Sequence, residues 1–378
     1  MRNRTQHRVE VVPSTGERET LVVTSPADAA VPLVWPKGLV RPRRPPRLVY
    51  LDMNHWIGLA QAATGHAQGA GHLAALDACR AAKAAGIALF PLSGAHYIEM
   101  YNITDPRQRR DLAAVMEELS SFATLASRST VMVLEVDAVL DAVAGRQFPI
   151  KAANLLGFGV GPAFGMRGGL RIRDADGRDT TAEFSASGDG AARLAEAELL
   201  FERALLAGPA DADLPDLVEQ GYDPRAAMKV ARQRADQEEE LRSRLDDDSR
   251  WRRGRLRDVV GARELRYELS DIVEKALSER GLAWDDVLGD RESLRGFMRA
   301  MPSTEVAIEL KRTRHRDPTL RWTPNDINDI DALSLAVPYC DVVVTEKFAH
   351  HVLTTSRVAE RMDTLTMCAL SDLLQHLI

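Results

Sequence analysis

The chain has 378 residues, of which 45% are hydrophobic and 28% are charged, and its formal net charge at pH 7 is −6. This length can bury a large core and is enough for one domain with a large insertion, or for two domains. The negative balance argues against electrostatic binding of nucleic acid over the whole surface. No apolar run approaches the roughly 20 residues that a membrane-spanning helix needs.

The first third of the chain predicts an extended arm followed by alternating strands and helices. Residues 1–46 mix charge with Pro and Val and show no helical period, so we expect an arm, with a strand at 20–24. The elements predicted after it are a strand at 48–52, an Ala-rich helix at 73–85 ended by Gly86, a strand at 87–90, a helix containing Glu99, a helix at 109–121 and a strand at 131–134.

Helical composition dominates residues 135–301, which we predict to be a mainly helical insertion packed over the sheet's active edge. The helices expected there are at 191–206, 224–246 and 263–280. The glycine-rich stretch 157–169 lacks the Gly-Lys-Ser/Thr of a phosphate-binding loop, so it predicts a loop or hairpin.

The last part of the chain returns to alternation. Thr323 and Pro324 are typical of a helix N-terminus. Around that helix we expect a helix at 302–314, strands at 341–345 and 364–367, and helices at 347–354 and 369–377. Alternation of this kind predicts an α/β fold with a mostly parallel sheet covered on both faces. The core then consists of residues 47–134 and 302–378.

Acidic residues follow the predicted strands. Asp52 ends the strand 48–52, Glu99 lies on the helix after the next strand, and Glu346 follows the strand 341–345. Ligand sites in parallel α/β sheets collect at the carboxyl ends of strands, so we expect these acids to converge. Burying carboxylates together is costly unless a cation lies among them, and Mg²⁺ and Mn²⁺ prefer such oxygen ligands.

Three further aspartates begin the helix after Pro324. Asp329 and Asp331 are separated by about 200° around a helix of 3.6 residues per turn, so they can scarcely face the same ion. Asp326 shares a face with Asp329, and it is alternatively placed to stabilise the positive end of the helix. Both Asp329 and Asp331 remain candidates for the catalytic acid.

Basic and aromatic residues flank the acids in sequence. Lys311, Arg312 and Arg316 run directly into the acidic helix start. Together with Arg110 we predict them to contact substrate, because phosphate binding needs only a few well-placed cations. Trp56 and Trp322 are either packed or available to stack on a base.

The N-terminal residues and the cysteines indicate the cellular compartment of the protein. The basic N-terminal octapeptide has no apolar segment of a secretory signal. Cys79, Cys340 and Cys368 are few and widely spaced and form no zinc pattern, which fits a reducing compartment. We therefore expect a cytoplasmic protein without a membrane partner.

The order of the acids resembles that of the PIN-like nuclease family. The matching segments are Leu51-Asp52-Met53-Asn54, the Ser93 to Glu99 helix, the Asp-rich helix start and Val344-Thr345-Glu346. They cover about residues 47–126 and 302–378. The family's last acid is usually an Asp two residues after the Thr, whereas here Glu346 follows the Thr directly.

This resemblance implies a three-layer α/β/α fold and a nuclease that uses Mg²⁺ or Mn²⁺ held by Asp52, Glu99, Asp329 and Glu346. Spacing to Thr345 favours Asp329, but Asp331 precedes Ala-Leu as the family acid often does. The implied substrate is nucleic acid, with RNA favoured, and a protein partner such as an antitoxin is a further expectation. The alternatives are a PIN-like module that has lost turnover and binds RNA or protein, and a metal-dependent phosphatase of small molecules on another α/β fold.

Overall fold

The computed structural model describes residues 7–11, 19–23, 46–144, 155–166, 170–210, 212–219, 223 and 226–377. Near the N-terminus, strands β1 (His7–Val11) and β2 (Glu19–Val23) pair in antiparallel fashion. The strand predicted at 20–24 therefore corresponds to β2. The remainder of the predicted arm, up to residue 45, lies outside the described residues.

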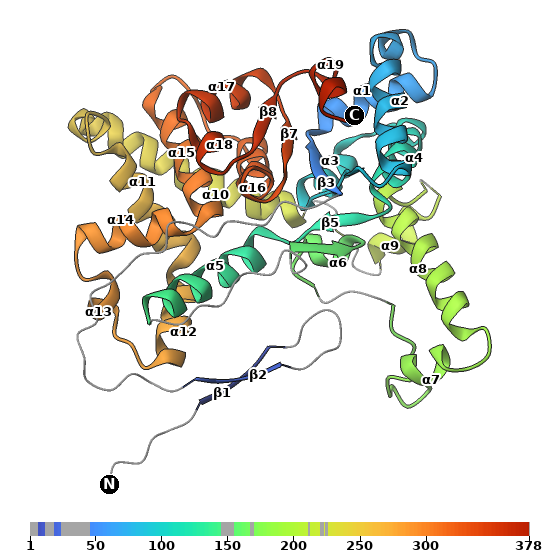
Figure 1. The fold of residues 1–378 in the computed structure, drawn as a ribbon, viewed down its shortest axis with the longest axis horizontal. Coiled ribbons are helices and arrows are strands. Elements are labelled where there is room, and N and C mark those ends of the chain that lie inside the picture. The colour runs from blue at the N-terminus through green and yellow to red at the C-terminus, as the bar shows by residue number, and fades with distance from the viewer. Residues whose placement is uncertain are drawn as a thin grey trace.

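A small parallel sheet joins the two parts of the predicted core. Its strands are β4 (Ala88–Leu89), β3 (Arg47–Leu51), β7 (Val342–Val344) and β8 (Leu365–Met367), in that spatial order, and every neighbouring pair is parallel. The pairing of β3 with β7 places two segments nearly 300 residues apart in sequence side by side (Figure 1). The prediction of an α/β fold with a mostly parallel sheet is therefore confirmed.

Helices cover both faces of the sheet. Side chains alternate along each strand, so neighbouring residues of a strand pack into different hydrophobic clusters. Val49 and Leu51 belong to one hydrophobic cluster, and Leu48 and Tyr50 belong to another. The first cluster is completed by α1 (Met53–Ala63), α2 (Leu73–Ala84) and α4 (Pro106–Ser120). The second is completed mainly by α15 (Pro302–Arg316), α16 (Pro324–Tyr339) and α17 (Lys347–Thr355). The remaining core helices are α3 (Gly94–Asn102), α18 (Val358–Arg361) and α19 (Leu370–Leu373).

The strand predicted at 131–134 is wrong, since these residues lie in helix α5 (Arg128–Val143). The β-branched run suggested a strand, but the Ser127 hydroxyl accepts a hydrogen bond from the Thr130 N–H at 3.2 Å and caps a helix. The actual strand comes earlier, at β5 (Ala123–Leu125), which pairs antiparallel with β6 (Leu156–Phe158). The predicted boundary between residues 134 and 135 therefore falls inside one continuous helix.

The middle of the chain is built mainly from helices, although the single helix predicted at 263–280 is interrupted by a π-helical turn at Leu265–Leu269. Its helices are α6 (Val160–Ala163), α7 (Thr181–Ser185), α8 (Gly190–Ala207), α9 (Leu214–Glu219), α10 (Ala226–Asp247), α11 (Leu256–Glu264), α12 (Ser270–Arg280), α13 (Trp284–Leu288) and α14 (Arg291–Ala300). A third hydrophobic cluster joins many of them to α5, and to α15 through Ile308. The glycine-rich stretch contributes β6 and α6, and residues 167–169 lie outside the description.

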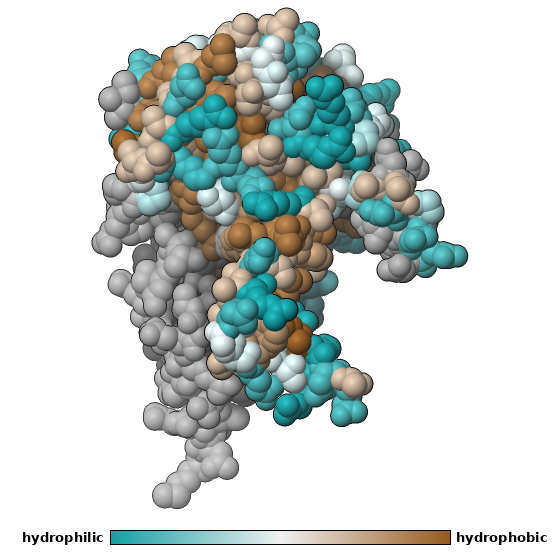
Figure 2. Space-filling model, turned by 90° about the vertical axis from the view of Figure 1, so that its right-hand side faces the viewer, coloured by the Kyte–Doolittle hydropathy of each residue, from teal (hydrophilic) through white to brown (hydrophobic). Residues whose placement is uncertain are grey.

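The side of the molecule that Figure 2 shows carries α1, α2 and α4 in its upper part and α7 and α8 in its lower part, and apolar surface is exposed on it among hydrophilic residues. The exposed apolar side chains include Leu199, Leu200 and Phe201 on α8. In the part of the chain that the structure describes, no helix combines the length and apolar character needed to span a bilayer.

Candidate functional site

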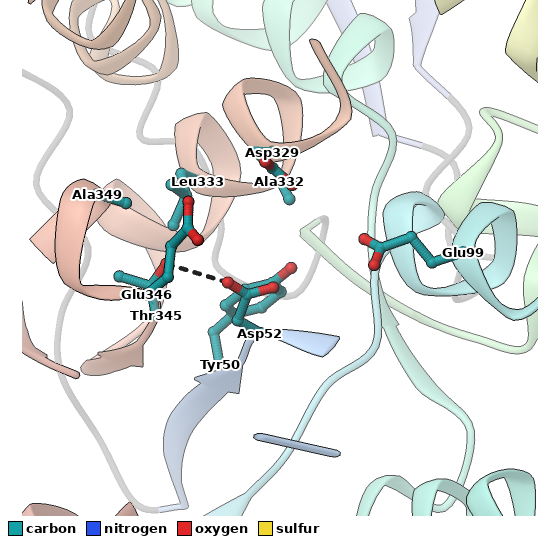
Figure 3. A pocket seen from close by; sticks show the side chains of 9 residues that line it. All are labelled: Tyr50, Asp52, Glu99, Asp329, Ala332, Leu333, Thr345, Glu346 and Ala349. Atoms are coloured by element: carbon teal, nitrogen blue, oxygen red, sulfur yellow. Dashed lines mark hydrogen bonds between the residues drawn. The ribbon is translucent and has the colours of Figure 1, made fainter. Parts of the chain in front are cut away.

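Four carboxylates from four separate elements line one pocket at the carboxyl ends of β3 and β7 (Figure 3). They belong to Asp52, Glu99, Asp329 and Glu346. The other lining residues are Tyr50, Ala332, Leu333, Thr345 and Ala349. The empty volume is about 280 Å³, including space open to solvent. The structure thus brings together the four acids that the sequence analysis selected as metal ligands.

Asp52 is held at the junction of the two central strands. Its backbone N–H donates to the Val344 carbonyl at 2.9 Å, which continues the pairing of β3 with β7. One carboxylate oxygen accepts from the Met53 N–H at 2.7 Å and caps α1, and the other accepts from the Thr345 hydroxyl at 3.3 Å. These two hydrogen bonds fix the orientation of the Asp52 carboxylate.

Glu99 is carried by α3, and His96 fastens that helix to the sheet. The Leu51 carbonyl can only accept, so His96 Nε2 donates to it, at 2.9 Å, while Nδ1 accepts from the Ser93 N–H at 3.0 Å. Burial lowers the pKa of His96 to about 4, which keeps the ring neutral. His96 is thus a buried, hydrogen-bonded helix residue, and Glu99 faces Asp52 across the pocket (Figure 3).

Helix α16 presents only one of its first three aspartates to the pocket. Thr323 caps the helix and Pro324 is its first residue, as predicted. Asp326 completes a capping box, because its carboxylate accepts from the Thr323 N–H at 2.7 Å and its own N–H donates to the Thr323 hydroxyl at 3.4 Å. Asp329 follows one turn later and lines the pocket. Asp331 lies on the opposite side of the helix.

The acids of the pocket disfavour one another's ionised forms. Burial first, and then the charges of Asp329 and Asp52, raise the pKa of Glu99 to about 8. Burial, Asp52 and Glu346 raise the pKa of Asp329 to about 7, and burial with Asp52 and Asp326 also raises that of Glu346. No ion pair within the described residues neutralises Glu99 or Asp329. A divalent cation would relieve this repulsion.

The donor chemistry fits Mg²⁺ or Mn²⁺, which take hard oxygen ligands. Within the described part of the chain, however, no group of three His, Cys, Asp or Glu side chains is already arranged to hold a metal ion. Magnesium commonly uses only one or two carboxylates and completes its coordination with water and substrate phosphate. The four acids are compatible with that mode of binding.

Asp331 and Lys311, predicted as a catalytic acid and a substrate contact, are instead members of a buried ion network. Arg234 Nη2 lies 2.8 Å from one oxygen of Asp331, with Nη1 on the other, and Arg128 lies 3.2 Å away. Lys311 Nζ is fully buried, 2.8 Å from Glu238 and in contact with Glu264. Both predictions are wrong because rotation about the helix axes turns these side chains away from the pocket.

None of the other predicted substrate contacts lines the pocket. Arg312 pairs with Glu309 at 2.6 Å, and helical spacing places the exposed Arg316 on that same face of α15. Arg110 is exposed on α4. Trp56 is fully buried, and Trp322 packs against His315 with ring centroids 4.8 Å apart, so neither is available to stack on a base.

The residue that the sequence analysis missed is Arg314, in the last turn of α15. Its Nη2 lies 2.8 Å from Asp326 Oδ2, which places a cation beside the first turn of α16. Arg314 belongs to the same basic run as Lys311 and Arg316. Only the rotation of α15 against α16 distinguishes it from those neighbours, and the sequence carries no signal for that rotation.

No protein-family model, no curated protein and no solved structure matches this chain. The resemblance to PIN-like nucleases therefore depends on the acids and their order alone.

Proposed function

We propose that the protein is a metal-dependent nuclease of PIN-like three-layer fold, which hydrolyses phosphodiester bonds of RNA with Mg²⁺ or Mn²⁺. The observation that carries the proposal is the convergence of Asp52, Glu99, Asp329 and Glu346 in one pocket. Acids from four distant segments, in the order that resembles the family, meet at the carboxyl end of a parallel sheet, where such folds place their ligands.

The four acids have different surroundings and therefore different tasks. Asp52, fixed by the Met53 N–H and the Thr345 hydroxyl, would hold a metal ion in a constant position. Asp329 and Glu346, on the α16 and α17 side, would complete its protein ligands. A bound divalent ion lowers the pKa of an attacking water and neutralises charge on the phosphate. Glu99, which faces Asp52 across the pocket (Figure 3), would be a further metal ligand or the base that takes a proton from the attacking water.

The experiment is RNA cleavage by purified protein. We expect cleavage of single-stranded RNA with Mg²⁺ or Mn²⁺, and none in EDTA. Asp52→Asn should lower the rate by at least about 100-fold, because even groups that only support metal ligands are commonly worth about 10–100-fold. Asp271→Asn, an equal charge change at an exposed position on α12, is the matched control. Equal rates for wild type and Asp52→Asn, with both variants folded, would refute the assignment.

The same samples address the alternative of a module without turnover. Such a protein would retain RNA or protein binding but cleave nothing with either metal. A protein partner such as an antitoxin would find exposed apolar side chains at Leu199, Leu200 and Phe201 on α8. Parallel assays with single-stranded DNA of the same sequence test the preference for RNA.

A further inference from the structure

Arg314 is held in a defined position next to the acidic pocket. Its Nη2 is tied to Asp326 Oδ2 at 2.8 Å and also donates to the Arg321 carbonyl. The guanidinium lies over the Trp322 ring, 5.2 Å from its centroid. With 16% of the side chain exposed, Arg314 is largely ordered by its neighbours yet still reaches the surface. Little conformational entropy would be lost if it bound an anion.

Arg314 is paired with the helix that carries one of the pocket's acids. Asp326, its ion-pair partner, precedes Asp329 by three residues and so lies on the same face of α16. The guanidinium of Arg314 therefore lies beside the face of α16 that carries Asp329 into the pocket.

Arg314 also has donors to spare. A guanidinium offers five N–H groups, and the bonds of Arg314 to Asp326 and to the Arg321 carbonyl both come from Nη2. Its Nε is buried, like those of Arg128 and Arg312, and is not accessible to a substrate. What distinguishes Arg314 from other arginines is its ion pair with Asp326, one helical turn from the Asp329 that lines the pocket.

The other cations of this helix cannot take that role. Lys311 is fully buried in its ion network, and Arg312 and Arg316 lie on a face of α15 about 160–200° away from Arg314. Among the basic residues near the end of α15, Arg314 is thus the one that pairs with the acidic first turn of α16.

We propose that Arg314 is a substrate-binding residue that contacts a phosphate of single-stranded RNA adjacent to the acidic pocket. This inference deepens the proposed nuclease function and rests on it. Arg314 is not a metal ligand, so its loss should weaken RNA binding without weakening metal binding.

The test compares Arg314→Met and Arg314→Lys with Arg244→Met, which removes an exposed, ion-paired arginine from α10. RNA affinity is measured in an Asp52→Asn background, where cleavage does not interfere, over a series of salt concentrations. Mn²⁺ affinity is measured by calorimetry with otherwise wild-type protein. Melting temperatures confirm that each variant is folded.

We expect Arg314→Met to weaken RNA binding about 10-fold or more, as loss of a charge-assisted hydrogen bond does. The slope of log K against log salt should become shallower by about 0.7, the value for one phosphate contact on a single strand. Mn²⁺ affinity should stay the same or increase, since a positive charge has been removed. Arg314→Lys should retain the salt slope but bind RNA less tightly, and Arg244→Met should match its parent.

Two results would overturn the role of Arg314. One is an Arg314→Met variant that matches Arg244→Met in RNA affinity and salt slope. The other is a loss of Mn²⁺ binding in Arg314→Met, which would mean that the arginine only supports the acids. Failure of the proposed function looks different: wild type would cleave no RNA with either metal, while the RNA-binding comparison would still decide whether Arg314 contacts phosphate.

Discussion

Replacing Lys311 with Met should destabilise the protein markedly, although Lys311 lies in a basic segment of a kind usually exposed. Its ammonium group is fully buried and serves two carboxylates, those of Glu238 at 2.8 Å and Glu264. Methionine fills a similar volume but leaves both acids with one cation fewer in an environment where water cannot replace it.

The expected loss is about 3 kcal/mol of unfolding free energy. Removing one partner of a buried ion pair typically costs about 3–5 kcal/mol. The lower end of this range applies because Glu238 and Glu264 both remain paired with Arg263, which lies 3.0 Å from each. Glu264 also remains paired with Arg128 at 2.8 Å. For a chain of this size about 2 °C of melting temperature corresponds to 1 kcal/mol, so we expect a decrease of about 6 °C.

Urea titration and thermal melting measure this loss, with Lys275→Met as the control. Lys275 is 78% exposed and its Nζ lies 3.9 Å from Glu279, so the control should lose no more than about 1 kcal/mol. Adding Glu264→Gln to Lys311→Met should restore part of the loss by removing an uncompensated charge. Equal melting temperatures for Lys311→Met and Lys275→Met would refute the buried network as a source of stability.

Two further predictions concern pH. Burial alone would raise the pKa of Glu238, but Lys311, His315 and Arg263 lower it to about 2. A depressed folded-state pKa contributes stability above the unfolded value near 4.5 that is lost as the pH falls toward 2, so the urea midpoint should drop in that range and Glu238→Gln should flatten the drop. Glu99 has the opposite sign: its pKa is raised to about 8, so metal-free protein should lose stability as the pH rises from about 4.5 to 8. Glu99→Gln should therefore melt higher than wild type in EDTA, by a margin that grows with pH, and a margin that is constant from pH 5 to 9 would contradict this.

The convergence of Asp52, Glu99 and Glu346 could be predicted because each follows a strand, and parallel strands end at one edge. The choice between Asp329 and Asp331 could not, since both begin the same helix. Asp331 differs from Asp329 in its ion pair with Arg234, a residue almost 100 positions away in sequence. Long-range partners of this kind leave no local pattern.

The same limit explains the errors at Lys311 and at residues 131–134. A basic run indicates that some of its members face solvent or ligand, but the packing angle of two helices decides which ones. Residues 131–134 have strand-like composition, but a capping Ser127 and the buried helical face of Val131, Val136 and Val139 favour a helix. Tertiary packing overrides composition there.

The buried ion network ties the core of the fold to the middle of the chain. Arg128, Lys311 and Asp331 belong to helices on the core side, whereas their partners Glu238, Glu264, Glu268 and Arg234 come from the middle of the chain. Of these ion pairs only the one between Arg128 and Asp331 lies within the core helices, so without that middle Lys311 would lose both Glu238 and Glu264. The core therefore cannot be separated from the middle of the chain as a module without compensating substitutions at those positions.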